Sequence, residues 1–245
     1  MACNAGPDII EDGLVLCLDA GNKLSYPGTG SVWYDISGNG NHFNLYNVPT
    51  FDTGNGGSIS FNGTDEYARS VNTIDLSHDG TYMVEAIWKV ANNQNSFLWE
   101  LSANWNSNAA ACGIVLHANG AGYTLGRSHQ NHSSRSGARN CNIPTENMKW
   151  NVSVQLLSSN YDPLGTLVYI NNELQDFVSE LGYPTSKNSN DFTSVGRNDY
   201  IWLGARNGFV APLLGNIASF KIYKDKKLSV NEIRQNHEAT AGRFV

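Results

Sequence analysis

Short segments in which apolar and polar residues alternate recur along the chain. In residues 82–90, Tyr82, Val84 and Trp88 fall on one side of an extended backbone, and Glu85 falls on the other. A period of two is typical of a strand with one buried face. Further strands are expected at residues 58–61, 152–156, 166–170, 200–203 and 217–223.

The run of apolar residues at 14–18 is unbroken, which predicts a strand covered on both faces. Clusters of Gly, Asn, Asp and Pro separate the segments, and Asn171-Asn172 predicts a hairpin turn. Many short strands without helices between them are typical of a sandwich or a barrel. The chain is therefore expected to be all-β.

One helix is predicted near the C-terminus, over residues 229–241. Ser229 and Glu232 have the spacing of a capping box, in which each side chain bonds the backbone amide of the other residue. Leu228 and Ile233 can form the accompanying hydrophobic staple. We expect this helix to pack beside the sandwich and to have a structural role.

Composition narrows the possible functions. The net charge is −6, which argues against a general nucleic-acid binder. No apolar run approaches the roughly 20 residues of a membrane helix, and the N-terminus lacks the features of a secretory signal. No linker divides the 245 residues, so a single domain is expected over 1–245, with an N-terminal arm at 1–11.

The four cysteines do not have the spacing of a metal site. Cys17 lies inside an apolar run, where it is expected to act as a small buried hydrophobic residue. Without a secretory signal the thiols are expected to be free. A bridge between Cys112 and Cys141 remains the alternative.

Both ends of the chain carry recognisable stretches. Near the N-terminus they are 12–22 (DGLVLCLDAGN), 25–30 (SYPGTG), 33–41 (WYDISGNGN) and 56–63 (GGSISFNG), followed by Tyr67. Near the C-terminus they are 214–223 (LGNIASFKIY), 228–236 (LSVNEIRQN) and 242–244 (GRF). These stretches resemble laminin-G-like, concanavalin A-like jelly-roll domains, particularly those in structural proteins of tailed phages.

The resemblance implies an antiparallel two-sheet jelly-roll sandwich with one short C-terminal helix, in which the first and last strands pair. Trp33 is expected to fill one end of the core. The segment 37–41 offers Gly and Asn for left-handed backbone positions, so the motif can be read as a folding signature alone.

A calcium site is the second interpretation of that motif, because relatives of this fold often hold Ca²⁺ at the rim of the sandwich. Hard oxygen ligands are available from separate loops. The candidate ligands are Asp19, Asn22, Asp35 and Asn39.

Catalysis is not expected. Glucanases of similar fold carry a Glu-x-Asp-x-x-Glu cluster on one strand, and this sequence lacks it. Glu85 and Glu100 stand alone on their predicted strands, and His129-x-x-His132 has no carboxylate nearby in the sequence. The chain is therefore predicted to be a non-enzymatic protein.

A basic segment in the middle of this acidic chain is the candidate contact region. Residues 127–139 are expected to form a loop that holds an acidic partner, an acidic sugar or a neighbouring subunit, and two nearby aromatic residues could stack on sugars. The candidate residues are Arg127, His129, His132, Arg135, Arg139, Trp105 and Tyr123.

Two functions fit these features. The first is a virion structural protein, made in the host cytoplasm, that decorates the capsid and binds the major capsid protein or neighbouring subunits through loops and termini. The alternative is a carbohydrate- or receptor-binding module, such as a tail-fibre adhesin or a lectin, that binds cell-surface glycans with or without Ca²⁺. Neither requires nucleic acid or a membrane.

Overall fold

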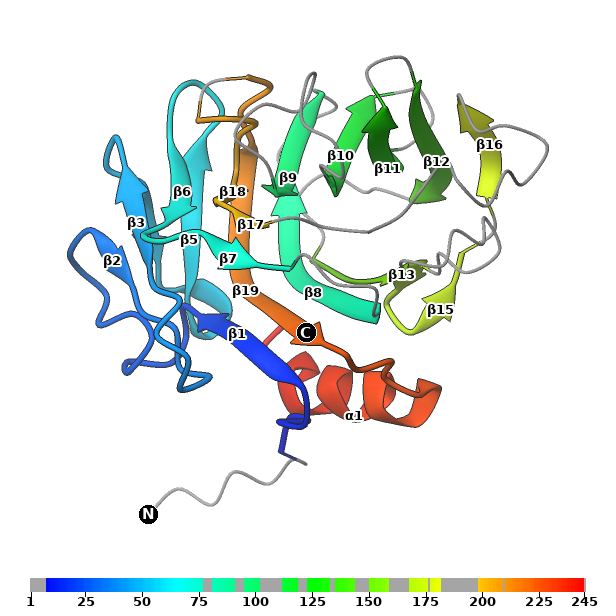
Figure 1. Cartoon of the computed structure of the whole chain (residues 1–245). Helices are drawn as coiled ribbons and strands as arrows, with labels where there is room; N and C mark the ends of the chain where they lie inside the picture. Colours follow the sequence, from blue (N-terminus) through cyan, green and yellow to red (C-terminus); the bar gives the residue numbers. More distant parts are fainter. Residues whose placement is uncertain are drawn as a thin grey trace.

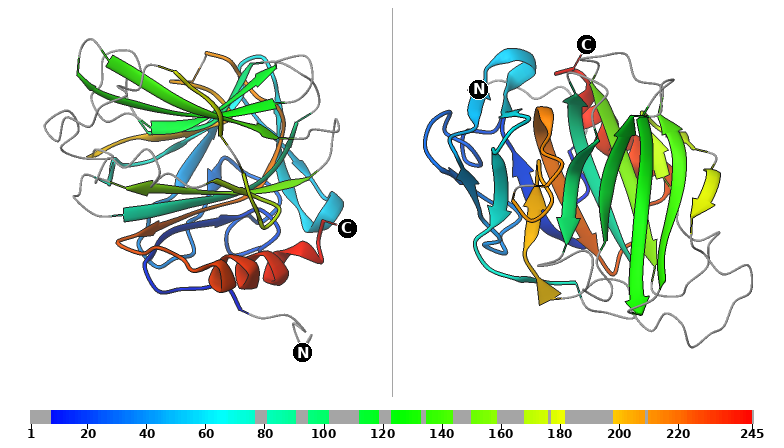
Figure 2. Two further views of the ribbon diagram at one scale, coloured as in Figure 1. Left: turned by 90° about the vertical axis from the view of Figure 1, so that its right-hand side faces the viewer. Right: turned by 90° about the horizontal axis from the view of Figure 1, so that it is seen from above.

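The computed structural model describes the chain at residues 8–76, 81–90, 95–101, 112–118, 123–132, 135–143, 150–158, 168–175, 177–181, 198–208 and 210–244. These residues form two large antiparallel sheets in layers and one helix against the outer side of one layer (Figures 1 and 2). The all-β prediction with one short C-terminal helix is confirmed.

The first sheet has eight strands in the described part of the chain. Across the sheet they are β15 (Glu173–Leu174), β14 (Val168–Ile170), β13 (Asn151–Ser158), β8 (Thr81–Val90), β19 (Leu214–Lys224), β5 (Ser58–Asn62) and β4 (Thr50–Asp52). The eighth strand, β1 (Leu14–Asp19), pairs with the second half of β19, while β5 pairs with its first half.

The second sheet has nine strands in the described residues. Their order is β16 (Phe177–Leu181), β12 (Arg135–Ile143), β11 (Tyr123–His132), β10 (Cys112–Ala118), β9 (Ser96–Leu101), β18 (Ile201–Leu203), β6 (Tyr67–Ser70), β3 (Phe43–Tyr46) and β2 (Val32–Trp33). The short strands β7 (Ile74–Asp75) and β17 (Asn198–Asp199) pair separately, and a 3-10 turn spans Gly54–Gly56.

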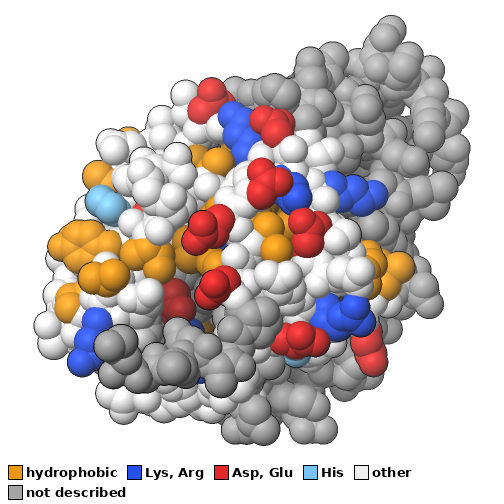
Figure 3. Space-filling model, turned by 90° about the horizontal axis from the view of Figure 1, so that it is seen from below, with side chains coloured by type: hydrophobic (Ala, Val, Ile, Leu, Met, Phe, Trp, Pro, Cys, Tyr) orange, Lys and Arg blue, Asp and Glu red, His pale blue; other side chains and the backbone are white. Residues whose placement is uncertain are grey.

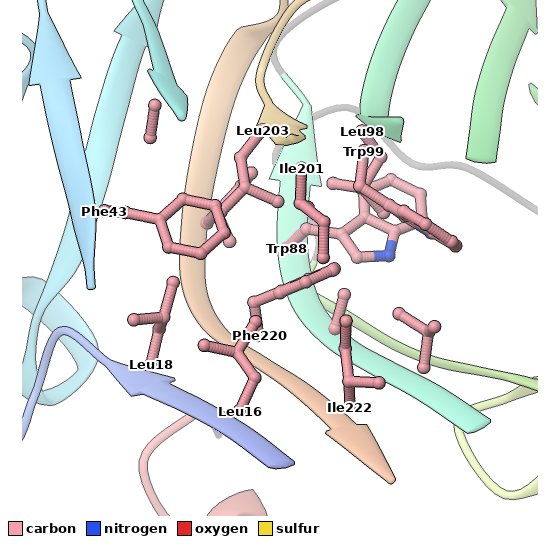
Figure 4. Close-up of a cluster of buried hydrophobic side chains, with 14 of the residues drawn as sticks. Leu16, Leu18, Phe43, Trp88, Leu98, Trp99, Ile201, Leu203, Phe220 and Ile222 are labelled. Atoms are coloured by element: carbon pink, nitrogen blue, oxygen red, sulfur yellow. The ribbon is translucent and has the colours of Figure 1, made fainter. Parts of the chain in front are cut away.

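The core lies between the two sheets. Trp88 and Phe220 of the first sheet face Trp99 and Leu203 of the second (Figure 4). Trp33 is fully buried among them, as predicted from the sequence. Because alternate residues of strands such as β1, β8, β6 and β19 enter this layer, the intervening residues of these strands lie on the outer faces of the sheets.

The first and last strands pair as the terminal resemblance implied, with Leu18 of β1 opposite Phe220 of β19. Leu16 and Leu18 enter the core, while Cys17 is buried on the other face of β1. The apolar run therefore forms a strand that is covered on both faces, as expected.

Helix α1 (Val230–Ala241) packs on the outer face of the first sheet (Figure 2). Its N-terminus has the predicted capping box, with both reciprocal bonds between Ser229 and Glu232. Leu228 and Ile233 share a buried cluster with Met83 and Tyr223 of the sheet, which confirms the staple and fixes where the helix sits. Within the described residues, no helix has the length and apolar character that crossing a membrane requires.

The backbone does not allow the bridge between Cys112 and Cys141. Cys112 lies on β10 and Cys141 on β12, and β11 runs between these two strands. Two strand spacings separate the cysteines by about 9–10 Å or more, whereas the Cα atoms of a disulfide lie within about 7 Å of each other.

Candidate functional site

The outer face of the second sheet carries a cluster of aromatic side chains around one arginine. Tyr46 of β3 lies opposite Tyr67 of β6, and Arg69 of β6 lies opposite Trp202 of β18. These residues alternate with core residues such as Leu45, Ala68 and Leu203, so the pleat directs them outward. With Tyr200, which directly precedes β18, they form what we call the Arg69 cluster: Tyr46, Tyr67, Arg69, Tyr200 and Trp202.

Rings surround the Arg69 guanidinium on several sides. Its central carbon lies 4.6 Å from the centroid of Tyr200 and 5.3 Å from those of Tyr46 and Trp202. Its Nη2 donates a 3.0 Å hydrogen bond to the Tyr46 hydroxyl, while Nε is buried without a hydrogen-bond partner. The cationic group is therefore held in place mainly by aromatic faces.

The rings also order one another. Tyr46 and Tyr67 are stacked, with centroids 4.7 Å apart and planes 11° from parallel. Trp202 lies 5.6 Å from Tyr67 at a tilt. Gly208, at φ +81°, lies against both Tyr67 and Trp202, and a Cβ there would lie 3.0 Å from each ring. The backbone approaches the cluster closely at this point and supports its edge.

A carboxylate lies next to the cluster and is neutralised within the protein. Glu100 of β9 is opposite Trp202, and it is fully buried. Its Oε2 accepts a 3.0 Å bond from the amide of Asn207, and its Oε1 lies 3.9 Å from Nε of Arg206.

The Tyr67 hydroxyl of the cluster is uncharged. Burial raises the pKa of Tyr67, so this phenol stays neutral at physiological pH.

The cluster combines two kinds of recognition group. The half-buried rings of Tyr46, Tyr67 and Tyr200 offer flat apolar surfaces that suit the C–H faces of a sugar ring. The guanidinium offers planar donors that match carboxylate or hydroxyl oxygens. This arrangement can bind a small polar ring, and it contains no pair of carboxylates for acid–base chemistry.

The α1 side of the molecule contains a cleft of about 900 Å³ between the end of the helix, β1 and the loop that follows β1. Figure 3, which shows this side, has acidic and basic side chains interleaved. Two charged groups that line the cleft are paired: Lys221 with Glu85, and Arg243 with both carboxylate oxygens of Asp19 at 2.8 and 2.9 Å. Burial raises the pKa of the Cys17 thiol to about 11, so this cysteine is a poor nucleophile.

Each of the four predicted calcium ligands has another partner. The Asp35 carboxylate accepts bonds from the amides of Cys17, Ser37 and Asn41 and from the Ser37 hydroxyl.

The remaining three candidates are occupied in a similar way. Asp19 pairs with Arg243, Asn22 caps the amide of Leu24, and the Asn39 amide donates to the carbonyl of Leu14 and to the Ser37 hydroxyl. Among the described residues no group of three His, Cys, Asp or Glu side chains could hold a metal. Calcium binding stays a prediction, and an ion at Asp19 would have to displace Arg243.

The basic segment is not the loop that the sequence suggested. Tyr123 to His132 form β11 and residues 135–143 form β12, which pair as a hairpin. The register places Arg127 opposite Arg139 and His132 opposite Arg135, while His129 lies opposite Gly137. These positions share one hairpin of the second sheet. Trp105 lies outside the described residues.

The isolated carboxylates do not converge. Glu85 lies on the outer face of the first sheet, and Glu100 lies on the outer face of the second. The whole sandwich separates them, so they cannot act as the acid and the nucleophile of a glycosidase.

The Arg69 cluster was not singled out from the sequence, although its signal is present there. In Tyr67-x-Arg69 and Tyr200-x-Trp202 the large side chains occupy alternate positions. The residue between each pair is apolar: Ala68 in the first and Ile201 in the second. Two-residue alternation assigns them to an outer face. The pairing of β3, β6 and β18, which brings them together, depends on long-range topology.

These features define an antiparallel β-sandwich with one helix-covered face and one aromatic face. Its fold is shared with the receptor-binding domain of botulinum neurotoxin D, at a TM-score of 0.65 and 14% identity over 95% of this chain and 53% of the toxin domain. The serotype D ligand-binding domain in complex with N-acetylneuraminic acid matches at a TM-score of 0.63 and 15% identity, over 95% and 52%. A sialidase from Trypanosoma rangeli matches at 0.62 and 15%, over 94% of this chain and 33% of the enzyme.

The likeness extends to the fold alone at these identities. The chain spans about half the length of the toxin domains and a third of the sialidase. No protein-family model matches the sequence, and no curated protein matches it either. The predicted sandwich is thus confirmed, while the concanavalin A-like, laminin-G-like assignment and the phage context stay predictions.

Proposed function

We propose that the chain is a carbohydrate- or receptor-binding module whose contact surface is the Arg69 cluster. The observation that carries the proposal is the outward set of aromatic rings around a guanidinium, on a sheet face that no described helix covers. Outward positions of a sheet in water normally hold polar side chains. Three half-buried tyrosine rings and a half-buried cation, backed by the buried Trp202, are well suited to a sugar.

The similar structures support this proposal at the level of fold. Two of them are receptor- or ligand-binding domains, and one was solved with N-acetylneuraminic acid. Because this chain spans only half of each domain, the ligand in that complex need not touch the matched half. The proposal therefore depends on the cluster itself.

A glycan array probed with the purified chain tests the proposal. Saturable binding is expected, and Tyr46→Ala and Tyr200→Ala are each expected to weaken it about tenfold or more. A nucleobase stacked on an aromatic side chain contributes roughly 1–3 kcal/mol, and we expect a comparable contribution from a ring that faces a sugar. Trp150→Ala is the matched control, since Trp150 is a half-buried ring that holds Lys89 on the first sheet, at 4.7 Å. Absence of binding to every glycan, or equal losses in all three variants, would refute the proposal.

Two additional assays test whether binding needs Ca²⁺ and whether the chain cleaves the glycan that it binds. Repeating the assay with a chelator shows whether binding needs Ca²⁺, and the occupied oxygens of Asp19 and Asp35 lead us to expect that it does not. Incubation of a bound glycan with the chain is expected to release no product, because the described carboxylates do not converge.

Capsid decoration stays a prediction from the resemblance at the two termini. The structures named above are toxin domains and a sialidase, and none is a virion protein. Binding to empty capsids at a fixed copy number per shell protein would support decoration and a virion location. A glycan site on the second sheet is compatible with that role, since many copies on one particle would raise avidity.

A further inference from the structure

The Arg69 side chain has donors that the protein leaves unused. A guanidinium has five N–H donors in a fixed fork. Here Nη2 bonds the Tyr46 hydroxyl, and Nε is buried without a partner. A buried donor without an acceptor is costly by about 1–3 kcal/mol. Nε is closed off from solvent, so the donors left for a ligand are those of Nη1, which is not among the fully buried atoms and makes no hydrogen bond to a described residue.

Arg69 differs from Arg206 and Arg243 in having no counter-charge among the described residues. Arg243 makes a two-pronged pair with Asp19, and Arg206 lies beside Glu100. Among the residues that the structure describes, no carboxylate lies within ion-pair distance of Arg69. Arg234 also makes no ion pair with a described residue, but it is exposed on α1, whereas Arg69 is half-buried among aromatic rings.

The ring walls strengthen an ionic contact at this position. Tyr46, Tyr200 and Trp202 replace water on three sides of the guanidinium. Because charges interact more strongly where water is excluded, a carboxylate bound there gains more than it would at an open surface. The carboxylate of Glu100, opposite Trp202, lies near Arg206 and accepts the amide of Asn207, which limits its repulsion of an anion.

The polar neighbours complete a sugar-sized surface. Asn44 lies opposite Arg69 on β3 and is half-buried, so it adds a polar side chain to the same outer face. The Tyr46–Tyr67 stack borders the same region. A six-membered ring on these aromatic faces would bring a carboxylate substituent to Arg69 and a hydroxyl to Asn44.

We infer that the Arg69 cluster selects sugars that carry a carboxylate, and that Arg69 is the residue that reads this group. The inference rests on the proposed glycan-binding function and adds its ligand class. The carboxylate can belong to a hexuronic acid or to a nonulosonic acid such as N-acetylneuraminic acid, since both offer a planar two-oxygen acceptor. Neutral sugars lack the group that would satisfy the guanidinium.

Calorimetric titration with matched ligands tests this inference. The probes are oligosaccharides that end in N-acetylneuraminic acid, oligosaccharides that end in glucuronic acid, and the carboxyl methyl ester of each. The better acid is expected to bind the wild-type chain at least tenfold more tightly than its ester. This advantage is expected to shrink as salt rises, since the ester carries no charge to screen.

Three variants separate the role of Arg69 from folding. Arg69→Gln is expected to remove the advantage of the acid, because it should lower the affinity for the acid by a much larger factor than the affinity for the ester. Arg69→Lys is expected to retain part of it, because lysine keeps the charge and loses the planar fork. Arg234→Gln is the control, since Arg234 is exposed on α1. Matching thermal transitions show that each variant folds.

The outcomes distinguish this inference from the proposed function. Equal affinity for acids and esters, or equal losses for both in Arg69→Gln, would overturn the acidic-sugar inference and leave glycan binding intact. Failure of every sugar to bind would overturn both. Selective loss of the acid in Arg69→Gln alone supports both.

Discussion

The outer faces of both sheets hold charged residues, but the surroundings of these charges differ between the two faces. On the first sheet, Glu85 of β8 lies opposite Lys221 of β19, and α1 covers both. On the second, Arg69 lies opposite Trp202, contacts three aromatic rings and has no carboxylate partner among the described residues. The first face satisfies its charges internally, whereas on the second we propose that a ligand compensates the charge of Arg69.

The covered face is a closed polar network. Lys221 and Glu85 are 2% and 1% exposed and form a direct ion pair. The Asn236 amide of α1 donates to Glu85 Oε2 at 3.0 Å and to the Tyr223 hydroxyl at 2.9 Å, and its oxygen accepts the amide of Ile10. Burial alone would lower the pKa of Lys221, but the Glu85 carboxylate raises it above its usual value, so the ammonium stays charged.

The difference between the two faces shows that a charged residue at an outward strand position can either stabilise the fold or remain without an internal partner. A buried charge is tolerated only when a partner and hydrogen bonds compensate for its lost hydration. The first sheet supplies these from its own strands and helix, which fixes the position of α1. The second sheet supplies rings without a counter-ion, which leaves the compensation to a ligand.

Breaking the covered ion pair is expected to have the largest effect on stability. Lys221→Met leaves the buried Glu85 without its counter-charge and should lower the free energy of unfolding by about 3–5 kcal/mol. Urea unfolding followed by tryptophan fluorescence measures the loss. The double variant with Glu85→Leu is expected to recover most of it, because two apolar side chains of similar volume remove both charges.

If Lys221→Met alone were as stable as the wild-type chain, the pair would not be the closed network described, and the contrast between the faces would fail. If the double variant were no more stable than Lys221→Met alone, the loss would come from altered packing and not from the unpaired Glu85 charge.

Removing the helix side of the network is expected to have the next largest effect. Asn236→Ala deletes three hydrogen bonds and leaves the Ile10 amide and the Tyr223 hydroxyl short of partners, at a cost of about 1–3 kcal/mol. Thermal unfolding measures it. Asn231→Ala, on the exposed side of the same helix, is the control and should change little. Equal effects in both would show that helix propensity, not the network, determines the loss.

Much of this fold could be predicted from local patterns. The alternation at 82–90, the doubly covered strand at 14–18 and the capping box at Ser229 depend on neighbours within a few residues, and the structure has each of them. Asn171 and Asn172 adopt the left-handed conformation that a tight hairpin turn requires, at φ 51° and 70°. Even the pairing of the terminal strands followed from the resemblance.

The candidate site could not be predicted in the same way. The alternation at 82–90 places Glu85 on the side away from the apolar residues, but its burial depends on what covers that side. Arg69 and Trp202 are 133 positions apart in the sequence, and only the order of β18 between β6 and β9 brings them together. The basic segment at 127–139 was read as a loop because its composition is polar, yet a strand pairing with neighbours on both sides can accommodate polar residues.

The capping box should make α1 sensitive to acid, with a smaller effect. Hydrogen bonds from Ser229 and Lys226 lower the pKa of Glu232 from 4.5 to about 2. A carboxyl with a depressed pKa in the folded chain contributes stability above its unfolded pKa, and the contribution is lost as pH falls from about 4.5 to about 2. Urea midpoints at several pH values measure this, and Glu232→Gln is the control.

The stability difference between the wild-type chain and Glu232→Gln should therefore be largest near neutral pH and vanish near pH 2. A difference that does not vary with pH would show that the carboxylate charge contributes nothing. Ser229→Ala removes the other half of the box and is expected to lower stability by about 1 kcal/mol at neutral pH.

Among these variants, Arg69→Gln is expected to change the stability of the fold least and the binding of acidic sugars most. Arg69→Gln removes a cation from ring contacts that contribute about 1 kcal/mol or less at a partly exposed site, and no internal carboxylate is left without its partner. Its urea midpoint should stay close to that of the wild-type chain, far from that of Lys221→Met. A loss of several kcal/mol would mean that Arg69 supports the fold in the way Lys221 does. An unchanged midpoint with lost affinity for acidic sugars is what a face prepared for a ligand requires, since the charge of Arg69 is then compensated only when the ligand is bound.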